Sequence, residues 1–177
     1  MPVFRGSEDD VLDRVYRCAR QFGMEVLVKF TGDNPLIDPD VIDEVVGYFL
    51  AEAEKFDYVS NLFPSTWPDG QELQIIRLTA LEAAWRESTL LFDREHVTPF
   101  IWQRPGRFRI ANVEGPDHRW RQEHRWTLDF PEDYEFIRRI FEALYPRKND
   151  FTLKDVMDLV ARQPDIAALN AQHRMSA

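Results

Sequence analysis

The stretch that decides the fold is VLVKFTGDNPLIDPDVIDEVV, residues 26–46. It begins with the apolar run VLVKF, broken only by Lys29, which is typical of a strand covered on both faces in a parallel sheet. A polar loop follows, and Asp38 with Pro39 is a common beginning of a helix. A strand that leads through a short loop into a helix is half of a βαβ unit. The segment therefore predicts an α/β fold.

The rest of the chain continues this alternation of strands and helices. Helices are expected over residues 8–22, 39–55, 80–88, 94–103 and 131–144, with another after Thr152 and a last short one within 164–177. Strands are expected over residues 26–30, 57–62, 72–78, 107–113 and 124–128. Short links between alternating elements are typical of right-handed βαβ units. We therefore expect one three-layer α/β/α domain with a Rossmann-like sheet over residues 1–177.

Local signals predict how several of these elements begin and pack. Ser7 is a candidate cap of the first helix, and Thr79 with Glu82 forms a candidate capping box for the helix over 80–88. The expected buried stripe of the first helix consists of Val11, Val15, Cys18 and Phe22. The strands over 107–113 and 124–128 are expected to form a hairpin around the turn signal EGPD.

The composition limits the classes of function. The net charge of −9 makes a general nucleic-acid surface unfavourable. Cys18 is the only cysteine, so an internal disulfide or a thiolate metal cage is excluded and a reducing cytoplasm is favoured. The amino-terminal residues lack the apolar core of an export signal, and no run approaches the roughly 18 apolar residues of a membrane span.

Asp33 is the aspartate in the opening stretch whose position suggests a function. Asp38 is a helix cap, and Asp40 lies in the first helical turn, where the helix dipole favours a carboxylate. Asp33 instead follows a strand, at the edge of the sheet where ligands of open α/β folds bind. The alternative is that Asp33 only forms a turn within Gly-Asp-Asn-Pro.

A second segment, HRWTLDFPEDYEFI, repeats this arrangement. Its apolar strand ends at Asp129, and Pro131 opens a helix whose first turn contains Glu132 and Asp133. Two strands that each deliver an aspartate to the same edge could hold one Mg²⁺, because magnesium needs few carboxylates and takes its other oxygens from phosphate and water. Asp33 and Asp129 are therefore the candidate metal ligands.

Five motifs in order give the sequence a family resemblance: VFRGSEDDVLDRV, VKFTGDNPLIDPDVID, DYVSN…PDG, REHVTPFI and RWTLDFPEDYEFI. The chain resembles the cytidylyltransferase-like family of spore-coat and surface polysaccharide biosynthesis proteins, which is similar to the synthetases that activate KDO and sialic acids. The resemblance covers roughly residues 3–144 and leaves 145–177 as carboxy-terminal helices and a tail. It implies a fold like that of nucleotide-diphospho-sugar transferases.

The resemblance also implies a reaction and a set of site residues. A sugar or sugar-acid hydroxyl would attack the α-phosphate of CTP and release pyrophosphate, with Mg²⁺ held by Asp33 and Asp129. The substrate-contacting residues would fall into three groups: Ser7 and Arg14 at the nucleotide, Asp69, Glu72 and Gln74 at the sugar, and Arg94 or His96 facing a ligand that the resemblance does not specify. For Arg14 the alternative is a surface ion pair with Asp10, one helical turn away.

Two departures from the family pattern bear on activity. The glycine- and arginine-rich loop that cradles the triphosphate has no match in the sequence, so we expect an amino-terminally incomplete sheet and little activity of the chain alone. Glu72 and Gln74 stand where the family usually has a DG-x-D-x-E pattern, so the sugar is open. The basic run RWRQEHR, residues 119–125, is interpreted as a solvated loop or a subunit contact.

Two other functions remain open. A glycosyltransferase could use the same carboxylates and cation to hold a nucleotide sugar. A non-catalytic remnant could bind a nucleotide weakly or dock to another subunit, and a homodimer is possible.

Overall fold

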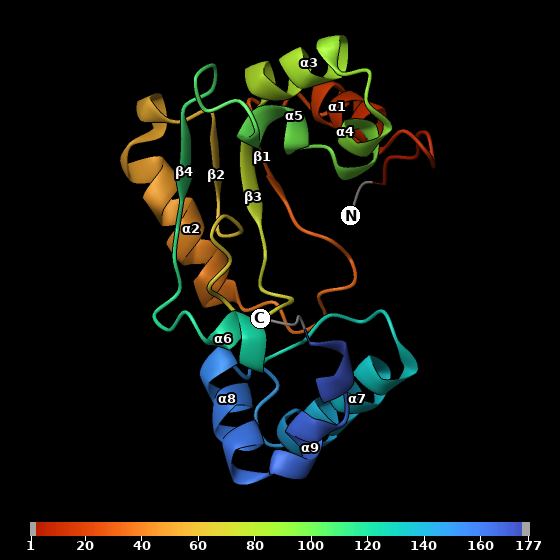
Figure 1. The fold of residues 1–177 in the computed structure, drawn as a ribbon, viewed down its shortest axis with the longest axis vertical. Helices are drawn as coiled ribbons and strands as arrows, with labels where there is room; N and C mark the ends of the chain where they lie inside the picture. Colours follow the sequence, from red (N-terminus) through yellow and green to blue (C-terminus); the bar gives the residue numbers. More distant parts are fainter. Residues whose placement is uncertain (1–2, 175–177) are drawn as a thin grey trace. The chain divides into compact units, whose positions relative to one another are not determined.

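The computed structural model describes residues 3–174, and no helix in that range is long and apolar enough to cross a lipid bilayer. By its internal contacts the chain divides into two compact units (Figure 1). Unit 1 comprises Met1–Lys29, Phe49–Ser60 and Gln74–Ala111, and unit 2 comprises Phe30–Tyr48, Asn61–Leu73 and Asn112–Ala177. Whether these units are one domain, as the sequence predicts, stays a prediction.

Unit 1 is built on a four-stranded sheet with the order β1-β3-β2-β4. The strands are β1 (Val26–Lys29), β2 (Tyr58–Ser60), β3 (Gln74–Arg77) and β4 (Ile110–Asn112). The predicted α/β class is therefore confirmed. The predicted direct parallel pairing is wrong, because β3 lies between β1 and β2 and is antiparallel to both. β1 is also not covered on both faces, since Val28 is 41% exposed.

The helices of unit 1 pack around a core of their own (Figure 1). They are α1 (Val11–Gln21), α3 (Leu78–Glu87), α4 (Leu91–His96) and α5 (Pro99–Trp102). The 3₁₀ turn η1 (Ala53–Lys55) also belongs to unit 1 but buries no residue. The buried residues of α1 are Leu12, Tyr16 and Ala19. Of the predicted stripe, Val11 and Val15 are partly buried against the same core, whereas Phe22 is 40% exposed. The cap of α1 is Asp10, whose carboxylate accepts from the Asp13 N–H at 2.9 Å, and not Ser7.

Two further helix predictions in unit 1 are wrong at their boundaries. α3 already begins at Leu78 without a side-chain cap, so Thr79 and Glu82 do not form the predicted capping box. The helix expected over 94–103 is two helices, because Val97 adopts a φ of 74°, which α-helical backbone cannot accommodate. Arg94 and His96 consequently lie in the last turn of α4, where the helix dipole favours basic side chains.

Unit 2 consists mainly of helices and long loops. It contains most of α2 (Pro39–Ala51), together with α6 (Trp120–Glu123), α7 (Pro131–Leu144), α8 (Leu153–Arg162), α9 (Pro164–Ala168) and the 3₁₀ turn η2 (Ala171–His173). α7, α8 and α9 pack on one another around Trp126, Phe136 and Ile140 (Figure 1). The predicted hairpin over 107–128 is wrong, because α6 interrupts it and residues 124–128 form only one isolated bridge, between Asp69 and Arg125.

Asp38 caps two helices of unit 2 at once. Its Oδ1 accepts from the Asp40 N–H at 2.7 Å, which confirms the predicted cap of α2, and its Oδ2 accepts from the Leu153 N–H at the start of α8. Thr152 and Asp155 form a capping box at the same start of α8, as the sequence predicts for Thr152. Since Asp38 is only 3% exposed, this shared carboxylate is a buried junction of the unit.

Candidate functional site

The two candidate metal ligands lie on neighbouring segments of unit 2. The backbone N–H of Leu128 donates to the carbonyl oxygen of Asp33 at 2.9 Å, so the loop after β1 runs beside the segment that ends at Asp129. Asp33 Oδ1 is buried and accepts no hydrogen bond from any residue that the structure describes. The side chain of Asp129 is 47% exposed. One carboxylate oxygen without a donor and one accessible carboxylate are thus carried by adjacent stretches of backbone.

Arg125 holds the carboxylate of Asp129 in place. Its Nη2 lies 2.6 Å from Asp129 Oδ2 and 2.9 Å from Asp133 Oδ2, and its Nη1 lies 3.1 Å from Asp69 Oδ2. Burial alone would lower the pKa of Arg125, but the hydrogen bonds that Arg125 donates to Asp133 and Asp129 and the negative charge of Asp69 outweigh burial, so the pKa is raised. Arg125 therefore stays charged and gathers three aspartates.

Asp133 is the buried centre of this cluster. It is 0% exposed, and besides Arg125 its carboxylate accepts from the backbone N–H groups of Asp129 and Phe130, both at 3.1 Å. Burial raises its pKa, but the hydrogen bonds of Arg125 and Asn170 more than compensate and lower it overall. Asp133 was predicted as a partner of the helix dipole, and the structure shows that it also fixes the backbone at Asp129.

Asp69 is joined to the Arg125 segment through the backbone. The Asp69 N–H donates to the His124 carbonyl at 3.0 Å, and the Trp126 N–H donates to the Asp69 carbonyl at 2.7 Å. Gly70 follows with a φ of +102°, and a Cβ there would lie 2.8 Å from the carbonyl carbon of Trp126. Only glycine fits this close approach, which explains the Asp-Gly pair in the sequence.

Arg121, on α6, connects Asp69 with Glu72. Its Nη1 contacts Asp69 Oδ1 and lies 2.5 Å from Glu72 Oε1, while Glu72 Oε2 accepts from the Gly70 N–H at 2.7 Å. Burial raises the pKa of Glu72 to about 7, against the attraction of Arg121. Glu72 is therefore the carboxylate of this cluster that can exchange a proton near neutral pH.

Two buried amides fix the loops that carry these acids. Gln71 Nε2 donates to the Leu36 carbonyl at 2.6 Å, and its Oε1 accepts from the Asp38 N–H at 2.9 Å. Asn61 Nδ2 donates to the Gln71 carbonyl at 2.8 Å, and its Oδ1 accepts from the Leu73 N–H at 2.9 Å. The loop after Asp33 and the loop from Asp69 to Glu72 are consequently cross-linked within unit 2.

The predicted nucleotide residues lie in unit 1. Arg14 reaches the backbone carbonyls of Ser7 and Glu8, so its predicted alternative, an ion pair with Asp10, is wrong. Asp10 instead pairs with Arg94, whose Nε lies 3.0 Å from Asp10 Oδ1 and whose Nη1 donates to the Trp85 carbonyl at 2.8 Å. The guanidinium of Arg94 is therefore used to hold Asp10 and the end of α3.

His96 and Gln74 complete the predicted set, and both also belong to unit 1. His96 is exposed and makes an edge contact with Phe92, with 4.5 Å between the ring centroids. Gln74 opens β3, and its buried Oε1 has no hydrogen-bond partner among residues 3–174. Each of the two therefore leaves a polar group that a ligand could use.

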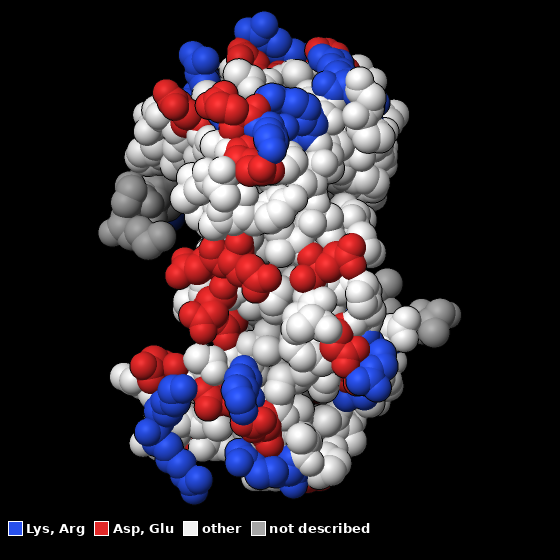
Figure 2. Space-filling model, turned by 90° about the vertical axis from the view of Figure 1, so that its left-hand side faces the viewer, with Lys and Arg blue, Asp and Glu red and all other residues white. Residues whose placement is uncertain are grey.

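Sequence reasoning missed Arg121, Arg125, Asp10 and Asn170 as members of these clusters. The run RWRQEHR was interpreted as a solvated loop or subunit contact, and this is wrong for Arg121 and Arg125, which turn towards Asp69. The sequence did contain an electrostatic signal for these arginines. In a chain with net charge −9, residues 119–125 include three arginines and a histidine, just before the candidate ligand Asp129. The face drawn in Figure 2 shows basic and acidic side chains interspersed, without a continuous basic field.

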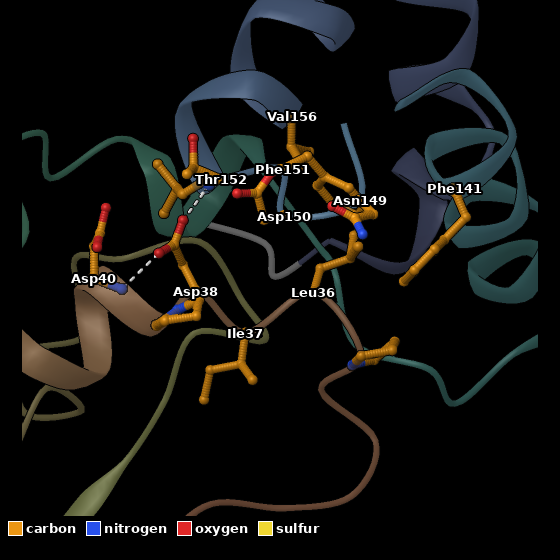
Figure 3. A pocket seen from close by; sticks show the side chains of 13 residues that line it. Leu36, Ile37, Asp38, Asp40, Phe141, Asn149, Asp150, Phe151, Thr152 and Val156 are labelled. Atoms are coloured by element: carbon orange, nitrogen blue, oxygen red, sulfur yellow. Dashed lines mark hydrogen bonds between the residues drawn. The ribbon is translucent and has the colours of Figure 1, made fainter. Parts of the chain in front are cut away.

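Unit 2 also contains a pocket of about 460 Å³ at the junction made by Asp38 (Figure 3). Its lining is partly apolar, with Leu36, Phe141 and Phe151, and partly acidic, with Asp38, Asp40 and Asp150 labelled in the figure. Both oxygens of Asp38 are used by the starts of α2 and α8. The carboxylate of Asp38 in this pocket is therefore already engaged in capping α2 and α8.

Asp33 and Asp129 offer carboxylate oxygens, the type of donor that a hard divalent cation prefers. Within the described range no group of three or more His, Cys, Asp or Glu side chains could hold a metal ion, so a transition-metal cage is not formed there. Two carboxylates fit Mg²⁺, which completes its coordination with phosphate oxygens and water. The buried, unpartnered Oδ1 of Asp33 is the atom that such a cation would satisfy.

Comparison with known proteins adds a family to this geometry. Residues 1–162 match the family model "Cytidylyltransferase". The chain is 30% identical over 169 residues to the spore coat polysaccharide biosynthesis protein SpsF of Bacillus subtilis, covering 93% of the chain and 67% of that protein. It is 38% identical over 85 residues to a 3-deoxy-manno-octulosonate cytidylyltransferase of Chlorobaculum tepidum, covering 48% of the chain and 34% of that protein.

A solved structure agrees with these sequence matches. The structure of a cytidylyltransferase from Leptospira borgpetersenii superposes with a TM-score of 0.87 at 26% identity, covering 99% of this chain and 70% of that one. The resemblance inferred from the five motifs is confirmed.

Proposed function

Because the chain belongs to the cytidylyltransferase family, we propose that it takes part in transferring a CMP group from CTP to a hydroxyl of a sugar or sugar acid, with release of pyrophosphate. The product would be an activated sugar for a surface polysaccharide. The similarity to SpsF and to a 3-deoxy-manno-octulosonate cytidylyltransferase supports this substrate class.

The observation that carries the proposal is the pairing of the segments of Asp33 and Asp129. The hydrogen bond from Leu128 N–H to the Asp33 carbonyl brings the two aspartates onto adjacent strands of chain, and Asp33 Oδ1 lacks a donor. We propose that both carboxylates hold Mg²⁺. When bound, the cation would neutralise charge on the phosphate oxygens of the nucleotide.

The residues of the chain would act by positioning and by charge. Arg125 keeps the Asp129 carboxylate in one orientation, and Asp133 fixes the backbone from which it projects. A carboxylate held by its neighbours needs no reordering when a cation arrives, so affinity is gained without new contacts. Asp69 and Glu72, held by Arg121, would accept hydrogen bonds from sugar hydroxyls, and Gln74 would assist them.

In unit 1, three residues would contact the nucleotide and a fourth would position them. Ser7 and Arg14 would line the base and ribose through the loop that Arg14 fixes, and His96 would contact the ligand directly because it is exposed. Arg94 would position this loop through Asp10 rather than touch the nucleotide.

The test is binding of CTP with Mg²⁺, measured by isothermal titration, in the wild type and in Asp33→Asn. We expect the variant to lose the part of the affinity that depends on Mg²⁺, and Asp158→Asn, a matched exchange on α8, to keep it. Unchanged Mg²⁺-dependent binding in Asp33→Asn would refute the metal role.

The reaction itself has a separate readout. With CTP and candidate sugars we expect pyrophosphate, whereas release of a nucleoside diphosphate from a nucleotide sugar would favour a glycosyltransferase. Low turnover by residues 1–177 alone stays a prediction, and rapid turnover would contradict it. A homodimer also stays a prediction, which light scattering can check.

A further inference from the structure

The loop of Asp129 is held from a part of the chain that the family match does not include. That match ends at residue 162, yet Asn170 and His173, after α9, contact the beginning of α7. We propose that Asn170 and His173 are positioning residues, which hold Asp129 in place to bind the cation that contacts the nucleotide phosphates. The inference rests on the proposed function, since Asp129 is a cation ligand only there.

Asn170 acts through the buried carboxylate of Asp133. Asn170 is 1% exposed, and its Nδ2 donates to Asp133 Oδ1 at 2.8 Å and to the Arg125 carbonyl at 2.9 Å. The other oxygen of Asp133 accepts the backbone N–H groups of Asp129 and Phe130. The Asn170 amide thus orients the carboxylate that fixes the backbone on both sides of the Asp129 Cα.

His173 holds the next residues of the same loop. Its ring stacks on Phe130, with 4.0 Å between centroids and 10° between planes. Its Nε2 lies 3.2 Å from Glu132 Oε2, and Gln172 Nε2 donates to Glu132 Oε1 at 3.1 Å. Phe130 directly follows Asp129, so the stack restricts how far the loop can move.

The side chain of Asp129 is oriented by Arg125 and by the backbone that this support holds. It is 47% exposed and contacts only Arg125 and Thr127 among the ion pairs and hydrogen bonds of its side chain in the described residues. If the backbone beneath it is loosened, a cation must order the loop as it binds. Removing residues that orient metal ligands commonly costs about tenfold to a hundredfold in metal affinity.

The experiment measures two properties in the full chain. The first is the affinity for Mn²⁺ in the presence of CTP, followed by electron paramagnetic resonance of the free ion. The second is hydrogen exchange at the Asp129 and Phe130 amides without cation or nucleotide, followed by NMR. Four variants are compared with the wild type: Asn170→Ala, His173→Ala, His173→Phe and the control Asn149→Ala. Asn149 is an exposed asparagine of unit 2, away from α9 and η2 in the sequence.

We expect Asn170→Ala to weaken Mn²⁺ binding by about tenfold or more and to accelerate exchange at both amides. His173→Ala should do so to a smaller extent, and His173→Phe should restore much of the loss because it keeps the stacked ring. Circular dichroism checks that each variant is folded. If Asn170→Ala does not fold, His173→Ala tests the positioning role.

The outcomes separate this inference from the proposed function. If the wild type binds Mn²⁺ and if Asn170→Ala and His173→Ala bind it as tightly as the wild type, the positioning role is wrong and the cation site stands. Wild-type exchange at both amides in the alanine variants would also overturn the positioning role. If the wild type itself binds no Mn²⁺ with CTP, the proposed cation site is wrong, and the inference falls with it.

Discussion

Asp133→Ala is the substitution whose effect the structure defines most fully. The carboxylate is 0% exposed and accepts from Arg125, from Asn170 and from the amides of Asp129 and Phe130. Removing one partner of a buried ion pair costs about 3–5 kcal/mol. Arg125 keeps Asp69 and Asp129, which reduces the cost, but the two amides and Asn170 lose their acceptor, which adds about 1–3 kcal/mol for each group left unsatisfied.

The two effects oppose each other, so we expect a loss of about 3–5 kcal/mol in the free energy of unfolding, or roughly 6–20 °C in Tm for a chain of this size. Asp133→Asn keeps an acceptor oxygen and should lose less, about 1.5–3 kcal/mol, as for a hydrogen bond to a charged group. Urea unfolding followed by tryptophan fluorescence measures the loss, and Trp126, one of the five tryptophans, is buried in the core of unit 2.

The control is Asp158→Ala on α8, an exposed aspartate that forms an ion pair with Lys154. It should change stability by less than about 0.5 kcal/mol, the usual range for surface substitutions. The reasoning is refuted if Asp133→Ala and Asp158→Ala lower the urea midpoint equally at an unchanged m value.

Three further predictions test other parts of the structure. Gly70→Ala should destabilise unit 2 by at least about 1–3 kcal/mol, because it adds backbone strain and a clash with Trp126; a wild-type Tm would contradict this. Glu72 has a pKa raised from 4.5 to about 7 in the folded protein. The folded state therefore binds this proton more tightly than the unfolded state, and the contribution of Glu72 to stability falls as pH rises from 4.5 to 7. Glu72→Gln removes this dependence, so the unfolding free energy of the variant minus that of the wild type should increase with pH. A difference that does not change with pH would argue against the raised pKa of Glu72. Leu12→Ala should cost about 2–5 kcal/mol and clearly more than Val11→Ala, and the reverse order in thermal melts would restore the stripe expected from the sequence.

Much of the fold could be predicted because its signals are local. Asp38 before Pro39 and Thr152 before α8 are caps that depend on the next three residues, and both were found. The stripe of α1 was missed by one position, because Val11 and Val15 are as apolar as the residues that are buried. Strand direction was missed because the apolar run 26–30 indicates burial and says nothing about which strand pairs with it.

The site residues that follow a local sequence signal could be predicted, and those that act through contacts distant in the sequence could not. Asp33 and Asp129 stand out because each lies at the end of an apolar run. Arg125 and Asn170 matter through partners 4 to 56 positions away, and nothing local distinguishes them from surface residues. Val97 is similar, since its positive φ depends on the packing of α4 and α5 and is unusual for a β-branched residue.

The shared carboxylate of Asp38 has a consequence for synthesis on the ribosome. Leu153, its second donor, is translated 115 residues after it. At the usual 5–20 residues per second this is a delay of roughly 6–23 s. During that interval Asp38 can serve only α2, and its other oxygen must remain hydrated. The nascent chain can therefore bury this junction only once α8 has emerged, which makes it a late step in the folding of unit 2.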